Sequence, residues 1–232
     1  MKLSLNQKVL ASVGVVAVVG ALAGAGTFAT FTAQTSNPTN TFANGTLVLS
    51  NKVNAGAACL STGAGTNTDV NANGSCSTAF NLAVKAPGDS GTTNLTLKNM
   101  GSLGASALKA FSGSCTDSDA AGENYHGTGS PCGKIQVYIQ QYSDSGFTTP
   151  SACLYGGAVV AGTCDFSDVS KTLATFVDDH TNLGEGLSAG SLAAAGGADS
   201  RWIKIGVQLP SDADNTYQGR AASLALNWHI TQ

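Results

Sequence analysis

The sequence has few charged residues, few aromatic residues and few prolines. Only 11% of its 232 residues are Asp, Glu, Lys or Arg, against roughly 25% in an average globular domain. The 11 basic residues form no stripe among the 14 acidic ones, which argues against nucleic acid as a partner. The 29 glycines do not recur at every third position, which excludes collagen. Ala, Glu, Lys, Leu and Arg do not dominate, which excludes a coiled coil.

The N-terminal segment has the pattern of a secretory signal. Lys2 and Lys8 precede an uncharged stretch from Val9 to Ala29, rich in Val, Ala and Gly, and such an order of regions is typical of a cleaved signal peptide. The small residues around Ala25 to Ala29 predict cleavage after Ala29. A permanent transmembrane helix is the alternative, but four glycines in the stretch weaken a helix. We therefore expect contact with a membrane only through this segment, before cleavage.

Six cysteines follow the predicted signal. An even number of cysteines in an exported chain indicates disulfides, and six allow 15 connectivities. The cysteines fall into three local couples, each enclosing a loop rich in Gly, Ser or Asn. We therefore expect the pairs Cys59–Cys76, Cys115–Cys132 and Cys153–Cys164. No Cys-x-x-Cys or Cys/His spacing typical of zinc is present.

Short stretches in which apolar and polar residues alternate dominate the rest of the chain. Period-two alternation predicts half-buried β-strands, and turn residues such as Pro87-Gly88-Asp89 separate the stretches. The predicted fold class is all-β, a jelly-roll-like antiparallel β-sandwich with a short helix and long disulfide-closed loops. The alternating stretches cover residues 46–50, 80–85, 94–98, 135–140, 202–209 and 224–230.

One region departs from the alternation. Val169, Leu173, Phe176 and Val177 are spaced by one to four residues, which predicts a short helix from about Asp168 to Asp178. We expect the following Gly/Ala/Ser-rich stretch, 183–195, to be a surface excursion.

Three stretches together resemble the TasA/camelysin family of secreted fibre proteins. GAGTFATFTAQTSNPTNTFANGTLVLS (24–50) is similar to the end of the signal and the start of the mature chain in that family. APGDSGTTNLTLKNMGSL (86–103) is similar to its Pro-Gly-Asp segment and the strand that follows. YQGRAASLALNWHITQ (217–232) is similar to its terminal strand. The six cysteines and the loops around them depart from the family pattern.

The resemblance implies export through a dedicated signal peptidase, a jelly-roll fold and assembly into extracellular fibres of a biofilm matrix or cell surface. In such fibres an N-terminal segment of one subunit fills a gap in the sheet of the next. The departure at the cysteines leaves open whether this chain polymerises in the same way.

The residues after Ala29 suit such a donor strand. The candidate strand contains one large apolar side chain, Phe31, and Asn37-Pro38 forms a natural hinge behind it. An extended tail on a hinge is suited to strand addition at a neighbour's edge, and head-to-tail addition generates a filament. A frayed terminus is the alternative. The donor-strand residues are Thr30, Phe31, Thr32, Ala33, Gln34 and Thr35.

No catalytic motif is evident. The camelysin branch is described as a metallopeptidase, but the three histidines, His126, His180 and His229, form no His-Glu-x-x-His motif. His180 follows Asp178-Asp179, which is a weak candidate for a metal or acid–base cluster; a solvated loop after a short helix is the preferred interpretation. We expect His229 on the outer face of the last strand and no enzymatic activity.

Calcium is the cofactor that the sequence leaves open. Asp69, Asn71 and Asn73 followed by Gly74 match the first half of an EF-hand loop, but the twelfth position is Phe80 instead of Glu. An Asx/Gly turn closed by a disulfide is the alternative, and no other cofactor is expected. Two further acidic loops contain Asp117, Asp119 and Glu123, and Asp212 and Asp214.

The sequence therefore predicts a signal peptide at 1–29, a donor segment at 30–40 and one sandwich domain at 41–232. We expect a secreted structural subunit in the extracellular matrix or on the cell surface of a bacterium or archaeon. Its expected partners are copies of itself in a filament and a minor anchoring or nucleating surface protein. An adhesin or binding module is the alternative function, and a metallopeptidase is a more distant one.

Overall fold

The described part of the chain is an antiparallel β-sandwich, as the sequence predicts. The computed structural model describes residues 45–63, 73–77, 86–160, 162–195 and 199–232. The predicted signal segment, cleavage site, donor strand and hinge lie outside these residues, and so does the strand predicted over 80–85.

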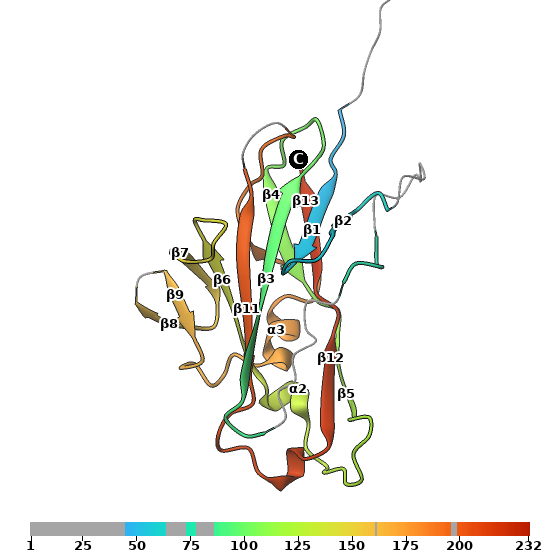
Figure 1. Ribbon diagram of the computed structural model, residues 1–232, viewed down its shortest axis with the longest axis vertical. Helices are drawn as coiled ribbons and strands as arrows, with labels where there is room; N and C mark the ends of the chain where they lie inside the picture. The colour runs from blue at the N-terminus through green and yellow to red at the C-terminus, as the bar shows by residue number, and fades with distance from the viewer. Residues whose placement is uncertain (1–44, 64–72, 78–85, 161, 196–198) are drawn as a thin grey trace, which may run out of the picture. The chain divides into compact units, whose positions relative to one another are not determined.

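The first layer is a six-stranded sheet (Figure 1). Its neighbouring strands are all antiparallel, and its longest pairing joins β3 to β11, with Ser90 opposite Gln208. In order across the sheet the strands are β2 (Ala58–Leu60), β1 (Leu49–Val53), β3 (Ser90–Asn99), β11 (Arg201–Gln208), β6 (Gln136–Tyr142) and β7 (Pro150–Tyr155).

The second layer consists of two short antiparallel sheets that follow one another along the same pair of chain segments. β4 pairs with β13, and β5 pairs with β12 after a short interruption in each segment. β10 adds to the other edge of β4. The bounds are β4 (Ala107–Phe111), β5 (Cys115–Asp119), β10 (Leu187–Ser188), β12 (Arg220–Leu224) and β13 (Asn227–Thr231).

The core lies between the two layers. Alternation along β3 and β11 turns Leu95, Leu97, Ile203 and Ile205 inward, and each has 0% of its surface exposed. Leu108 of β4 meets them from the second layer and is equally buried. Burial of one such side chain stabilises a fold by about 1.5–3 kcal/mol, so these alternating strands account for the sandwich.

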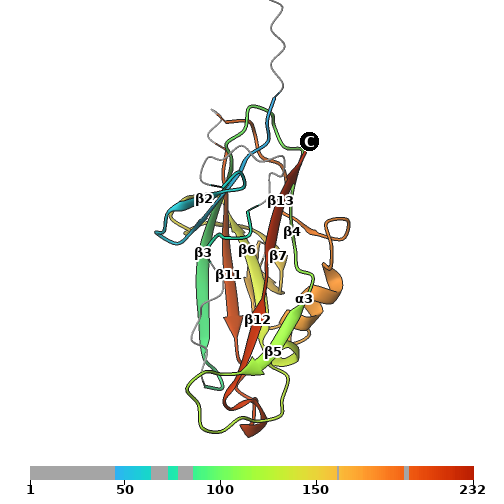
Figure 2. The same cartoon turned by 90° about the vertical axis from the view of Figure 1, so that its right-hand side faces the viewer.

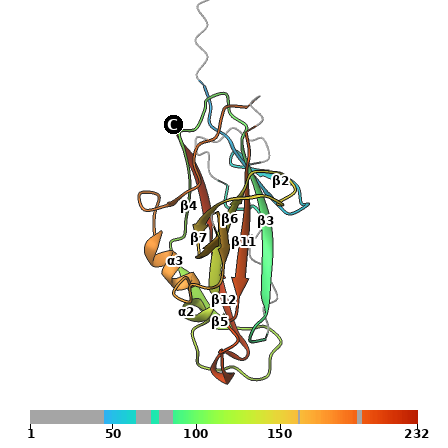
Figure 3. The same cartoon turned by 90° about the vertical axis from the view of Figure 1, so that its left-hand side faces the viewer.

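Two short helices complete the second layer. Figures 2 and 3 show α2 (Pro131–Lys134) and α3 (Leu173–Asp179) on the same side of β3 and β11 as β5 and β12. Phe176 of α3 is 2% exposed and belongs to the core. The remaining elements are the β8 (Gly157–Val160) and β9 (Thr163–Asp165) hairpin and the 3-10 turn η1 (Asn215–Tyr217).

The cysteines pair as their spacing predicts. Cys59–Cys76 joins β2 to the segment 73–77, Cys115–Cys132 joins β5 to α2, and Cys153–Cys164 joins β7 to β9. Each bond ties neighbouring elements together, and the third closes a β-hairpin instead of an irregular loop.

Three local predictions need correction. The helix begins at Leu173 instead of Asp168, and Val169, placed on its apolar face, is 76% exposed. The alternating stretch 224–230 spans the end of β12 and most of β13. The predicted surface excursion at 183–195 contains β10 and packs into the fold, because Leu192 is only 1% exposed and bridges to Ala105.

Candidate functional site: an open strand edge beside an apolar groove

β12 and β13 lie at an edge of the second layer. In the part of the chain that the structure describes, β12 has β5 as its single strand partner and β13 has β4. An antiparallel strand directs only alternate residues' backbone groups toward one neighbour. The other half of the N–H and C=O groups of β12 and β13 therefore faces away from the sheet, as at any edge open to strand addition.

A long groove with a volume of about 1040 Å³ runs beside this edge. Side chains of both layers line it, because the groove lies between β1 of the first sheet and β12–β13 of the second. Its apolar lining includes Leu47, Leu49, Val207, Leu209, Leu224 and Trp228, with Ile135 and Leu173 contributing further apolar surface.

Two buried polar atoms in the groove lack hydrogen-bond partners. The side-chain oxygen of Asn51 and the indole N–H of Trp228 are both inaccessible to water and unpaired, and both residues line the groove. One atom accepts and the other donates. Buried polar atoms are nearly always satisfied, so these two atoms are exceptions to the usual pairing, but a ligand in the groove cannot contact them while they are inaccessible.

The Cys59–Cys76 disulfide forms part of the rim of the groove. Asn73 holds this rim, since its Nδ2 donates to the carbonyl oxygen of Leu60 at 2.9 Å and its Oδ1 accepts from the Ser75 N–H at 2.9 Å. Asn73 thus forms an Asx turn. Asp69 and Asn71, the other two calcium candidates, lie outside the described residues.

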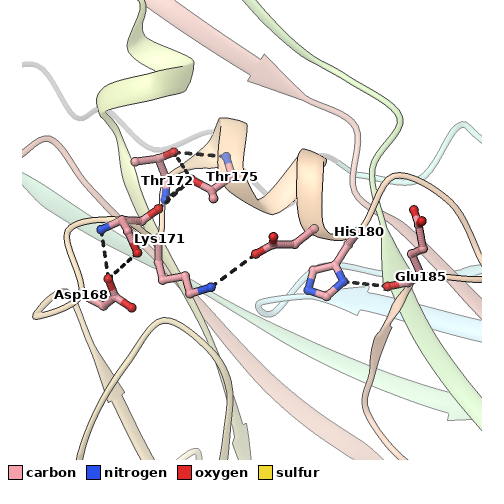
Figure 4. A network of polar contacts seen from close by, with 8 residues as sticks. Asp168, Lys171, Thr172, Thr175, His180 and Glu185 are labelled. Carbon is pink, nitrogen blue, oxygen red and sulfur yellow. Dashed lines mark hydrogen bonds and ion pairs between the residues drawn. The ribbon is translucent and has the colours of Figure 1, made fainter.

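The predicted cluster at Asp178, Asp179 and His180 is not a metal-holding group in the described part of the chain, and Figure 4 shows the His180 ring turned toward Glu185. Nδ1 of His180 lies 2.8 Å from the carbonyl oxygen of Glu185, and Asp179 forms an ion pair with Lys171 at 3.3 Å. His180 instead packs against the rings of Phe176 and Tyr155. Across the described residues, no three His, Cys, Asp or Glu side chains lie close enough together to hold a metal ion.

Tyr155 lies at the centre of this packing. Its ring meets Phe176 edge-on, with centroids 5.1 Å apart, and the Lys171 ammonium lies 4.7 Å from its centroid. Burial raises the pKa of the Tyr155 phenol far above its ordinary value, and the neighbouring Asp179 carboxylate raises it further. Tyr155 therefore stays neutral at physiological pH.

The other two histidines lie in different parts of the chain, His126 in the loop between β5 and α2 and His229 in β13. Nδ1 of His126 lies 2.7 Å from the carbonyl oxygen of Gly219. His229 is exposed on β13 while Ile230 beside it is buried, as its position after Trp228 predicts.

The acidic loops are occupied by contacts within the chain. Asp117 accepts a hydrogen bond from the Cys132 N–H at 2.8 Å, Asp119 pairs with Arg220, and Asp212 pairs with Lys134 at 3.0 Å. Hydrogen bonds from Thr216 lower the pKa of Asp214, which caps η1. These carboxylates stabilise turns and helix ends.

The sequence pattern alone identified neither the groove nor the open edge. Its strand predictions include much of the lining, but which strands form edges depends on sheet order. Comparison with protein-family models and with curated proteins finds no match. Three disulfides indicate an oxidising, extracellular environment, and no helix among the described residues is long and apolar enough to span a membrane.

Proposed function

We propose that this chain is a secreted structural subunit that assembles into extracellular fibres by head-to-tail β-strand donation. The observation that carries the proposal is the edge of β12–β13 beside an apolar groove, an edge with no further strand partner among the described residues. A strand entering this groove adds backbone hydrogen bonds to the edge and buries its apolar side chain between the two layers.

The proposed donor is the segment 30–40 of a second copy. Its one large apolar residue, Phe31, supplies an anchor for the apolar lining of the groove. Because donor and groove are different surfaces, each subunit accepts one strand and donates another, and the contact does not close. The resemblance of three segments to the TasA/camelysin family supports the same assembly, with cleavage after Ala29 releasing the donor.

The first test compares two purified chains by negative-stain electron microscopy, one starting at Thr30 and one at Thr41. We expect filaments only from the longer chain. Filaments from both chains would remove segment 30–40 from the mechanism, and filaments from neither, at any salt or calcium concentration, would contradict the fibre function.

A second test asks whether the donor segment binds in the groove. A synthetic peptide of residues 30–40 should bind the chain that starts at Thr41 and change the fluorescence of Trp228, measured in a Trp202→Phe background so that one indole reports. A scrambled peptide is the control. An unchanged Trp228 signal despite binding would place the donor elsewhere.

A third test blocks the edge. The carbonyl oxygen of Gly219 accepts a hydrogen bond from the Ala120 N–H, so the backbone groups of Gly219 point toward β5. Backbone groups alternate in direction along an antiparallel strand, so those of Ala221 also point toward β5. The backbone N–H of Ala222 therefore points away from β5. Ala222→Pro removes that donor and is tolerated on an edge strand. We expect Ala222→Pro to stop filament growth and Ala222→Ser to permit it. Normal filaments from the folded proline variant would exclude β12 as the acceptor.

A further inference from the structure

The six-stranded sheet carries charge of one sign only. None of its strands contains Asp or Glu, and its four charged residues are Lys52, Lys98, Arg201 and Lys204. The whole chain has more acidic than basic residues. The positive charge of this sheet therefore stands apart from the charge of the molecule as a whole.

Three of these cations have no carboxylate partner among the described residues. Arg201 pairs with Asp199, and the described cations outside the sheet are paired or bonded as well: Lys134, Lys171 and Arg220 bind carboxylates and Lys109 binds two carbonyl oxygens. Lys52, Lys98 and Lys204 remain. All three point to the outer face of the sheet, since their strand neighbours Val53, Leu97 and Ile203 point to the core.

Lysine and aromatic side chains lie next to one another on that face. Strand register places Lys52, Thr96, Trp202 and Tyr142 side by side across four strands. Adjacent strands are about 4.8 Å apart, so this row runs roughly 15 Å across the sheet. The Lys204 ammonium lies 4.6 Å from the centroid of the Tyr142 ring. Figures 2 and 3 show both helices and the second layer on the opposite side of β3 and β11.

A strained turn extends the row. Phe147 has φ of 55°, a left-handed conformation that is rare for a bulky residue and is found where function requires it. The Asp144 carboxylate holds the turn by accepting from the N–H groups of Gly146, Thr148 and Thr149. This conformation brings the Phe147 ring against Tyr142, with centroids 5.7 Å apart.

We propose that this outer face binds an acidic polysaccharide. We name it the cationic aromatic face, and its residues are Lys52, Lys98, Tyr142, Phe147, Trp202 and Lys204. Aromatic rings provide flat apolar surfaces for the C–H faces of sugar rings, while the separated lysines match carboxylates spaced along a uronic acid polymer. Nucleic acid fits less well, because its closely spaced phosphates favour dense basic clusters and the chain has a net charge of −3.

This binding function is separate from the fibre assembly proposed above. The cationic aromatic face lies on the outside of the first layer, whereas the groove lies between the layers. A chain that never polymerises should bind the polymer, and a chain that binds no polymer can still form fibres.

The test measures binding of the secreted chain to polygalacturonate by isothermal titration calorimetry, with dextran as the neutral polymer. We expect binding to polygalacturonate alone, weakened at high ionic strength. Lys98→Gln/Lys204→Gln should weaken it at least about tenfold. The matched control, Lys134→Gln/Lys171→Gln, removes two lysines that form ion pairs with carboxylates, one in α2 and one before the start of α3, and should leave the affinity unchanged.

Trp202→Ala tests the aromatic row and should also weaken binding at least about tenfold, with circular dichroism confirming the fold; the lysine variants carry the test if this variant unfolds. The proposal is overturned if polygalacturonate does not bind at low ionic strength, or if the two lysine pairs lose affinity equally. Tighter binding of single-stranded DNA than of polygalacturonate would overturn the assignment in favour of nucleic acid.

Discussion

Gln140 shows how a single polar residue can have a role that alternation does not predict. The pattern places it on the polar face of β6, yet it is 1% exposed, and its amide contacts backbone atoms of the β8–β9 hairpin. Its Nε2 lies 2.8 Å from the Ala152 carbonyl oxygen and 2.6 Å from that of Gly162, and its Oε1 accepts from the Cys164 N–H. One side chain thus anchors the hairpin to the sheet.

Gln140→Leu should lower the free energy of unfolding by about 2–4 kcal/mol, since an unpaired buried donor or acceptor costs about 1–3 kcal/mol and more than one is left. Urea denaturation measures the loss. Gln141→Leu, one residue along and half-buried, is the control and should change stability little. Equal losses in the two variants would contradict the anchoring role.

The raised pKa of Tyr155 predicts how the stability of the fold changes at alkaline pH. Its folded pKa is raised above the unfolded value of 10.0, so its contribution to stability is fully present below pH 10 and declines as pH rises above that value toward the folded pKa. In an absorbance titration at 295 nm, Tyr155 should ionise only when the chain unfolds. Tyr155→Phe should remove one late-titrating phenol; an unchanged late phase would contradict the assignment.

The short helix shows what governs the ends of an element. Apolar spacing predicted its existence and its end near Asp178, but not its start. Ser170 donates to the Asp168 carboxylate through both N–H and Oγ, which forms a turn, and these bonds lower the pKa of Asp168. The helix then begins after Thr172, which forms a capping box with Thr175. Local side-chain hydrogen bonds, and not the apolar spacing, therefore determine where this helix begins.

Thr172→Ala should cost about 1 kcal/mol of stability, the usual value of an N-cap. Thermal and urea unfolding measure it. Thr181→Ala, beyond the end of the helix on an exposed turn, should stay within about 0.5 kcal/mol of the parent. A Thr172→Ala variant as stable as the parent would show that α3 is held by its core contacts alone.

At the scale of the whole molecule, the sequence predicted the class of fold and the disulfides but not the surfaces. Tyr142, Phe147 and Trp202 are dispersed along the chain, and only the register of β6 with β11 and the turn after β6 bring them together. The groove likewise depends on which strands form edges. Both features are set by pairings between distant segments, which a local pattern does not contain.

The disulfides should dominate the thermal stability of the molecule. Loops of 11 and 17 residues are each worth about 3 kcal/mol in the loop-entropy model. Since about 1 kcal/mol shifts Tm by roughly 2–4 °C in a domain of this size, reduction and alkylation should lower Tm by roughly 15 °C or more. Differential scanning calorimetry measures this shift, and an unchanged Tm would contradict it.

The pairing of each cysteine with the next one along the chain also bears on the order of events during synthesis. If the chain enters an oxidising compartment with its N-terminus first, Cys59 meets Cys76 before any other thiol is present, and the same holds for each later pair. At every moment the first available partner is the native one. The native disulfides can therefore form one after another in chain order, without the thiol–disulfide exchange that crossed connectivities require.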